Sequence, residues 1–137
     1  MKSRFIASLA LAATAIGLAT TPAVAAKPKL TGEAKLAKIL EGRQAGKPVS
    51  CLPLGGSADT RIIDKTAIVY RVGSTLYVNR PSNADSLDRD DILVSRLTQG
   101  RPCRLDIVNL VDRASRFPSG FVGLQDFVPY KKVATAR

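Results

Sequence analysis

Alternating apolar and polar residues predict a β-hairpin in the middle of the chain, within residues 62–80. The segments 66–72 and 75–80 are dense in β-branched and aromatic residues, which suit a pleated, half-buried surface. Gly73 and Ser74 separate the two segments. A glycine in the first position of a two-residue loop can adopt the positive φ that a type II′ turn requires. Because an isolated hairpin is only marginally stable, other apolar segments must cover it.

Three later segments also have strand-like patterns. They are 92–97, 103–111 and 121–124. In the second segment both faces become apolar toward the end, which predicts a central strand that carries Cys103. Asp106 would then be partly enclosed and would need a partner such as Arg104 or Arg71.

A helical pattern precedes the strands. Leu36, Ile39 and Leu40 are spaced three and four residues apart and form one apolar stripe. Thr31 can cap the start of this helix, and Gly42 is expected to end it. We therefore expect a mainly β (α+β) fold, with a small curled antiparallel sheet or partly open barrel of about five or six strands and one N-terminal helix.

The first 25 residues have the three parts of a secretory signal peptide. Lys2 and Arg4 form a basic start, an apolar run follows, and small residues close the segment. We predict cleavage after Ala25, with cleavage after Ala26 as the alternative. An uncleaved membrane anchor is disfavoured because polar residues and a glycine interrupt the run. Residues 26–137 would then form a single small β-rich domain without a membrane-spanning segment, in a periplasmic or secreted protein.

The chain has two cysteines, Cys51 and Cys103, and no histidine. In an oxidising compartment two cysteines most simply form one disulfide. A catalytic thiol would need a base, and a cysteine-rich metal site would need more ligands at close spacing. We therefore predict a structural disulfide between Cys51 and Cys103.

The predicted mature chain is strongly basic. Removal of Lys2 and Arg4 leaves 19 basic residues against 11 acidic ones, a net charge of +8. Such a charge favours anionic envelope polymers such as lipopolysaccharide, anionic lipid headgroups or nucleic acid. Nucleic acid fits less well, because the few aromatic residues are not interleaved with arginines. The basic residues are spread along the sequence, which is typical of a solvated surface.

Candidate catalytic and metal-binding groups are few. Without a histidine, the familiar nucleophile and base arrangements cannot be assembled. Asp64, Asp106 and Asp126 lie near strand ends and could act as paired carboxylates, although turn formation or ion pairing is the better explanation of them. The acidic segment 85–91 lacks the spacing of an EF-hand loop. We expect no catalytic residues, no metal site and no cofactor.

The order of these features resembles a family of small exported proteins of Gram-negative bacteria that is classed only as a domain of unknown function. The resemblance is carried by Cys51 and by residues 62–64, 66–70, 76–79, 103–106 and 124–130. It implies an exported, two-cysteine, β-rich domain and brings no catalytic residue.

These observations together predict a non-catalytic binding or structural module of the cell envelope with a basic surface. Its partners would be anionic envelope polymers or a periplasmic protein. The alternatives are a carboxylate-based envelope hydrolase and an inhibitor of an envelope-acting enzyme. Lysozyme is a poor target for such an inhibitor, because lysozymes are usually basic and would be repelled.

Overall fold

The computed structural model describes residues 29–53, 55, 59–97 and 99–134. The predicted signal peptide and both cleavage positions, Ala25 and Ala26, lie outside these residues. Within them, no helix is long and apolar enough to cross a membrane.

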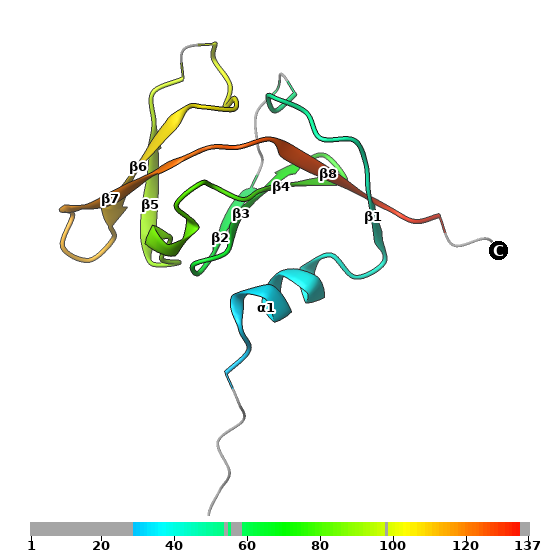
Figure 1. The fold of residues 1–137 in the computed structure, drawn as a ribbon, viewed down its shortest axis with the longest axis horizontal. Helices are drawn as coiled ribbons and strands as arrows, with labels where there is room; N and C mark the ends of the chain where they lie inside the picture. The colour runs from blue at the N-terminus through cyan, green and yellow to red at the C-terminus, as the bar shows by residue number, and fades with distance from the viewer. Residues whose placement is uncertain (1–28, 54, 56–58, 98, 135–137) are drawn as a thin grey trace, which may run out of the picture.

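The described chain contains one α-helix, eight strands and a short 3-10 helix (Figure 1). The elements are α1 (Gly32–Ile39), β1 (Arg43–Ala45), β2 (Asp59–Ile63), β3 (Ala67–Val72), β4 (Thr75–Asn79), η1 (Ala84–Ser86), β5 (Asp91–Ser95), β6 (Ile107–Asp112), β7 (Pro118–Gly123) and β8 (Phe127–Lys132). The strands form two antiparallel sheets, one in the order β1-β8-β4-β3-β2 and the other in the order β5-β6-β7. The mainly β fold with one N-terminal helix is thus confirmed, with eight strands in two sheets.

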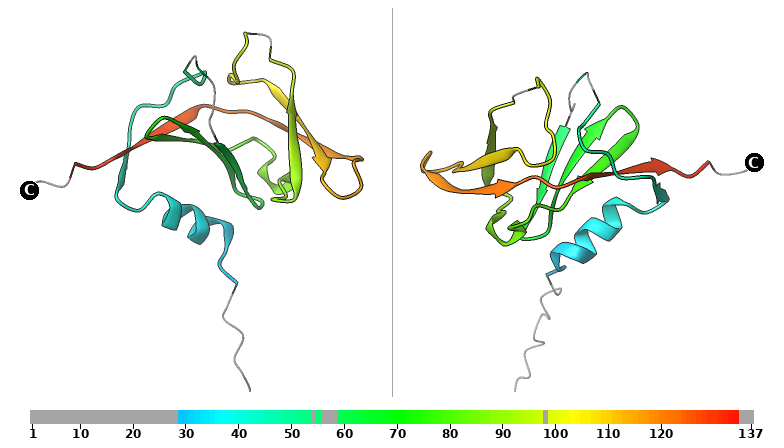
Figure 2. Two further views of the ribbon diagram at one scale, coloured as in Figure 1. Left: turned by 180° about the vertical axis from the view of Figure 1, so that it is seen from behind. Right: turned by 45° about the horizontal axis from the view of Figure 1, so that its top comes forward.

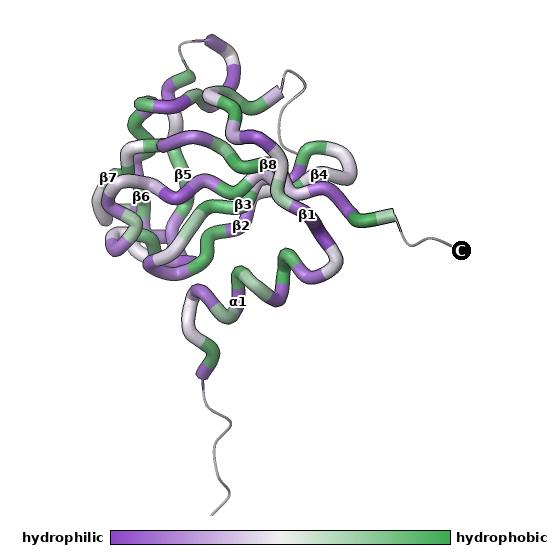
Figure 3. The backbone as a smooth tube through the Cα atoms, turned by 45° about the vertical axis from the view of Figure 1, so that its right-hand side comes forward, coloured by the Kyte–Doolittle hydropathy of each residue, from purple (hydrophilic) through white to green (hydrophobic). Residues whose placement is uncertain are grey.

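The five-stranded sheet is covered on both faces. The helix α1 packs on one face through Leu36, which meets Val69 and Val78 in one apolar cluster. The three-stranded sheet packs on the other face, where Ile68 and Tyr70 belong to a second cluster together with its inward side chains. Figure 2 shows these layers from two further sides. Figure 3 shows the alternation of apolar and polar residues along α1 that gives the helix one buried stripe.

The predicted hairpin and helix cap are confirmed. Val72 pairs with Thr75 across a two-residue loop, and Gly73 has a φ of 58°, as a type II′ turn requires. Thr31 Oγ1 accepts a hydrogen bond from the Ala34 N–H at 3.2 Å, which satisfies a free amide of the first helical turn. The helix ends at Ile39, three residues before Gly42, which has a φ of 68°.

The predicted disulfide joins Cys51 to Cys103, but the strand expected to begin at Cys103 begins later. Residues 103–106 form a turn, in which Asp106 Oδ2 accepts the Cys103 N–H at 2.8 Å and Leu105 has a φ of 72°. Short aspartate side chains favour such turns, because they hydrogen-bond to nearby backbone amides. The expected pairing of Asp106 with an arginine is therefore wrong, and β6 starts at Ile107.

Strand β8, which contains Pro129, was not among the strands expected from the sequence. This residue lies opposite Tyr77 of β4, and its carbonyl accepts the Gly46 N–H at 2.7 Å on the other side. Ala45 pairs with Tyr130, and Val49 pairs with Phe127. Three residues lie between Ala45 and Val49 but only two between Phe127 and Tyr130, so the chain beside β8 has one extra residue at this point. This bulge leaves room for a residue without an N–H.

Candidate anion-binding groove

One edge of each sheet borders the same groove. Strand β2 ends the five-stranded sheet, β5 ends the three-stranded sheet, and the groove between them has a volume of about 680 Å³. Apolar side chains and hydroxyl groups form its walls, and three arginines line it. The lining residues are Thr60, Arg61, Ile62, Tyr70, Arg89, Asp91, Ile92, Leu93, Ser95 and Arg113. We call this site the basic groove.

The three arginines reach the basic groove from three different parts of the chain. Arg61 lies on β2, Arg89 lies just before β5, and Arg113 lies in the loop after β6. All three are exposed, and neither Arg61 nor Arg113 forms an ion pair with any described residue. Arg89 Nε lies 3.8 Å from Asp90 Oδ2, an exposed pair that contributes little. These guanidinium groups are therefore available to an anionic ligand.

The acidic residue in the groove wall does not neutralise these arginines through an ion pair. Asp91 is buried, and its Oδ1 accepts the Ser119 hydroxyl at 2.7 Å. The loop that carries Arg113 is held against the start of β5, because the Arg113 N–H donates to the Asp90 carbonyl at 3.1 Å. This hydrogen bond fixes the backbone of one arginine relative to the groove.

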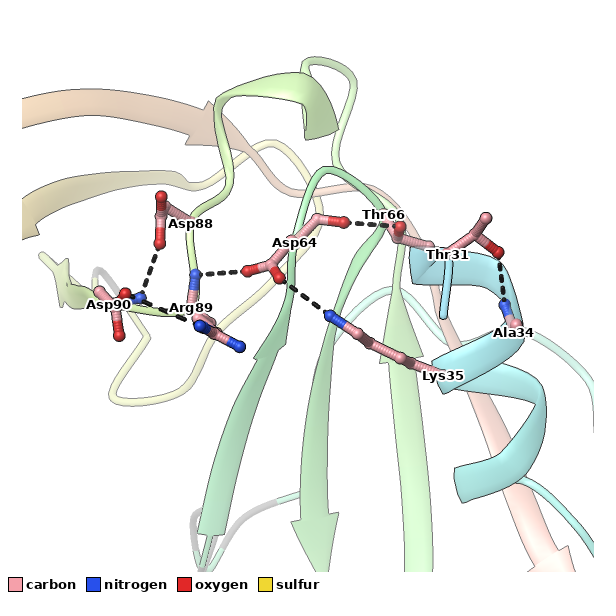
Figure 4. A network of polar contacts seen from close by, with 8 residues as sticks. All are labelled: Thr31, Ala34, Lys35, Asp64, Thr66, Asp88, Arg89 and Asp90. Carbon is pink, nitrogen blue, oxygen red and sulfur yellow. Dashed lines mark hydrogen bonds and ion pairs between the residues drawn. The ribbon is translucent and has the colours of Figure 1, made fainter. Parts of the chain in front are cut away.

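Asp64 ties together the elements beside the basic groove (Figure 4). Its Oδ2 lies 3.1 Å from Lys35 Nζ on α1, and its Oδ1 accepts the Arg89 N–H at 2.8 Å. Its carbonyl accepts the Thr66 hydroxyl at 2.8 Å. Desolvation raises the pKa of the Asp64 carboxyl, but the hydrogen bonds from Arg89 and Lys35 and their charges outweigh it, so the pKa lies below its usual value. Asp64 is thus a charged structural link that positions Arg89.

A second hollow of about 430 Å³ lies between α1 and β2. It shares the lining residues Arg61, Ile62 and Arg89 with the basic groove. Lys38 adds an ammonium group from α1, beside an apolar floor that includes Ile39, whereas the ammonium group of Lys35 pairs with Asp64 there. Basic side chains that are scattered in the sequence are therefore gathered in two hollows that meet at the β2 edge. A further basic cluster, with Lys47, Lys131 and Lys132, lines a separate hollow beside β1 and β8.

The three candidate carboxylates do not form one site. Asp64 interacts with Lys35 and Arg89, as described above. Asp106 accepts the Cys103 N–H, and Asp126 Oδ1 lies 3.6 Å from Arg104 Nε. Among the described residues, no three His, Cys, Asp or Glu side chains are grouped closely enough to hold a metal ion.

The arginines of the basic groove were not singled out from the sequence. Arg61, Arg89 and Arg113 are separated by more than twenty residues at each step, and no local motif connects them. Only the meeting of the β2 and β5 edges brings them together.

The resemblance to an exported family stays a prediction. No family model matches this chain, and neither a curated protein nor a solved structure matches it.

Proposed function

We propose that the mature chain is a non-catalytic binding module of the cell envelope that holds a phosphate-bearing anionic polymer in the basic groove. The observation that carries this proposal is the convergence of Arg61, Arg89 and Arg113 on one groove between two sheet edges. The disulfide supports an oxidising compartment, and hence a periplasmic or secreted location.

Arginine is suited to this role because its planar guanidinium offers paired N–H donors that match the oxygens of a phosphate or carboxylate. A charge inside a groove with apolar walls is also screened less than one on a flat surface. Ile62 and Leu93 in the walls provide such surroundings. The hydroxyl groups of Thr60 and Ser95 lie at the same groove and suit the sugar hydroxyls of an envelope polysaccharide.

The test measures binding of the mature chain, residues 26–137, to deacylated lipopolysaccharide before and after removal of its phosphates. Deacylated material keeps the anionic sugar and excludes contacts with acyl chains. The double variant Arg61→Gln/Arg113→Gln removes two charges from the groove. Its matched control, Lys131→Gln/Lys132→Gln, removes two charges at β8.

We expect the groove variant to bind at least about tenfold more weakly, since a hydrogen bond to a charged group contributes roughly 1.5–3 kcal/mol. The control should stay within about threefold of the wild type at moderate salt. Equal weakening by both variants would show that only net charge matters and would refute the groove as the binding site. Unchanged binding after phosphate removal would refute the ligand class.

A further inference from the structure

The outer face of the three-stranded sheet exposes apolar side chains on both sides of a central asparagine. Val94, Asn109 and Phe121 pair across β5, β6 and β7, and all three are exposed. Their strand neighbours Val108 and Val122 are fully buried against the five-stranded sheet. Because successive side chains of a strand point to opposite faces, the exposed row lies on the side away from the rest of the molecule.

Further apolar side chains extend this surface. Ile107 on β6 is exposed, and Val111 and Ile92, which pair with each other, are half-buried. The most exposed apolar residues adjoin the two ends of β6: Leu105 in the turn before it is 72% exposed, and Phe117 after it is 73% exposed. We call Val94, Ile107 and Phe121 the outer apolar face. Groups of exposed apolar side chains on one face are a feature of surfaces that contact proteins or membranes.

The charges around the outer apolar face indicate what covers it. Residues 92–124 contain five arginines and two aspartates, a net charge of +3. One of these arginines, Arg113, lines the basic groove, which leaves four arginines for the rest of the segment. Both aspartates accept hydrogen bonds within their own turns, Asp106 from Cys103 and Asp112 from Ser115. Arg104 directly precedes Leu105, and Arg116 directly precedes Phe117. Apolar side chains flanked by cations are the pattern of a surface that rests on anionic lipid.

A second copy of the chain fits this surface less well. A two-fold contact through the outer apolar face would place the same arginine-rich segment on both sides of the interface. Like charges brought together in this way oppose association, whereas lipid phosphates would neutralise them.

We propose that the outer apolar face docks on an anionic lipid surface, with the flanking arginines contacting headgroup phosphates. Val94, Ile107 and Phe121 do not line the basic groove, so the proposal goes beyond the binding of a polymer there. Each arginine close to an anionic membrane strengthens binding by roughly fivefold. The apolar side chains add burial in the interfacial region.

The experiment is vesicle flotation with the mature chain, using vesicles of phosphatidylcholine with phosphatidylglycerol and vesicles of phosphatidylcholine alone. Phe121→Ser removes the aromatic side chain of the outer apolar face, which is 57% exposed. Val94→Ser is compared with Val133→Ser, because both valines are about half exposed and Val133 lies after β8, outside the face. Thermal melts and sedimentation of each variant report its folding and its oligomeric state.

We expect binding to the anionic vesicles, about tenfold or greater weakening by Phe121→Ser, and a severalfold weakening by Val94→Ser. Val133→Ser should bind within about twofold of the wild type. Absence of binding to anionic vesicles would overturn the proposal, as would equal effects of Val94→Ser and Val133→Ser. A wild-type dimer that Phe121→Ser dissociates would instead assign the face to a second copy and would also overturn it.

Discussion

Removal of the disulfide is expected to cost this small domain a large share of its stability. The bond joins Cys51, in the segment between β1 and β2, to Cys103, in the turn before β6. It therefore connects a segment between two strands of the five-stranded sheet to the turn that leads into the three-stranded sheet. Two backbone hydrogen bonds lie beside it, from the Leu52 N–H to the Pro102 carbonyl at 3.0 Å and from the Arg104 N–H to the Ser50 carbonyl at 2.6 Å.

The magnitude follows from the length of chain that the bond closes. The cysteines are 52 residues apart, and the loop-entropy relation gives about 4 kcal/mol for a loop of that length at 25 °C. Small domains have total stabilities of roughly 5–15 kcal/mol. For a domain of this size 4 kcal/mol corresponds to a fall in melting temperature of about 15–20 °C. The effect arises in the unfolded chain, which gains freedom when the crosslink is absent.

The assay is urea unfolding of the oxidised mature chain and of the Cys51→Ser/Cys103→Ser variant, with the free energy of unfolding extrapolated to water. Reductant should move the wild-type midpoint toward that of the variant and should leave the variant unchanged, which separates loss of the bond from other effects of the reductant. A variant within about 1 kcal/mol of the oxidised wild type would refute the reasoning.

Two further predictions concern the contacts around Asp64. Asp64→Asn should lower the free energy of unfolding by about 1 kcal/mol at neutral pH. The pKa of this carboxyl is lowered in the folded protein. The stabilisation by the ionised carboxylate is therefore present above about pH 4 and is lost as the pH falls through the folded pKa. A gap in urea midpoint between wild type and variant that persists at about pH 2 would contradict this. Gly32→Ala should lower the melting temperature although alanine favours helices, because a Cβ at Gly32 would clash with the Thr66 side chain and lie 2.7 Å from the Asp64 carbonyl. A melting temperature of Gly32→Ala above that of the wild type would contradict this prediction, because it would show that the neighbouring atoms move away from the new Cβ without a cost in stability.

The elements that could be predicted from the sequence are those fixed by local chemistry. The hairpin depends on Gly73 and on alternation over a few residues, and the helix depends on Thr31 and a stripe centred on Leu36. The sorting of Ile68 and Val69 to opposite faces also followed from alternation. In each case the signal and the structure that it specifies lie within one segment.

The errors arose where a side-chain hydrogen bond or a distant pairing partner, and not the apolar pattern, decided the local structure. The residues after Cys103 have a strand-like composition, yet the Asp106 carboxylate captures the Cys103 amide and turns the chain. The reverse occurs in β8, where Pro129 argues against a central strand. A bulge between Ala45 and Val49 accommodates the proline, and this bulge depends on their pairing with Tyr130 and Phe127, about eighty residues later in the sequence. Local propensity carries no information about such partners.

The basic groove could not be predicted either, because its residues are brought together by contacts between distant parts of the chain. Its arginines are also not explained by protection of a sheet edge alone. A charged residue on an edge strand prevents pairing with other chains, and this alone would account for Arg61 on β2. It does not account for Arg89 and Arg113, which lie outside the strands and still line the groove beside Arg61. Both faces of the five-stranded sheet are covered. At its β2 edge, however, residues of this sheet and of β5 line one groove that a ligand can enter. The convergence of three cations at that edge is therefore the feature of this fold that favours anion binding over simple protection.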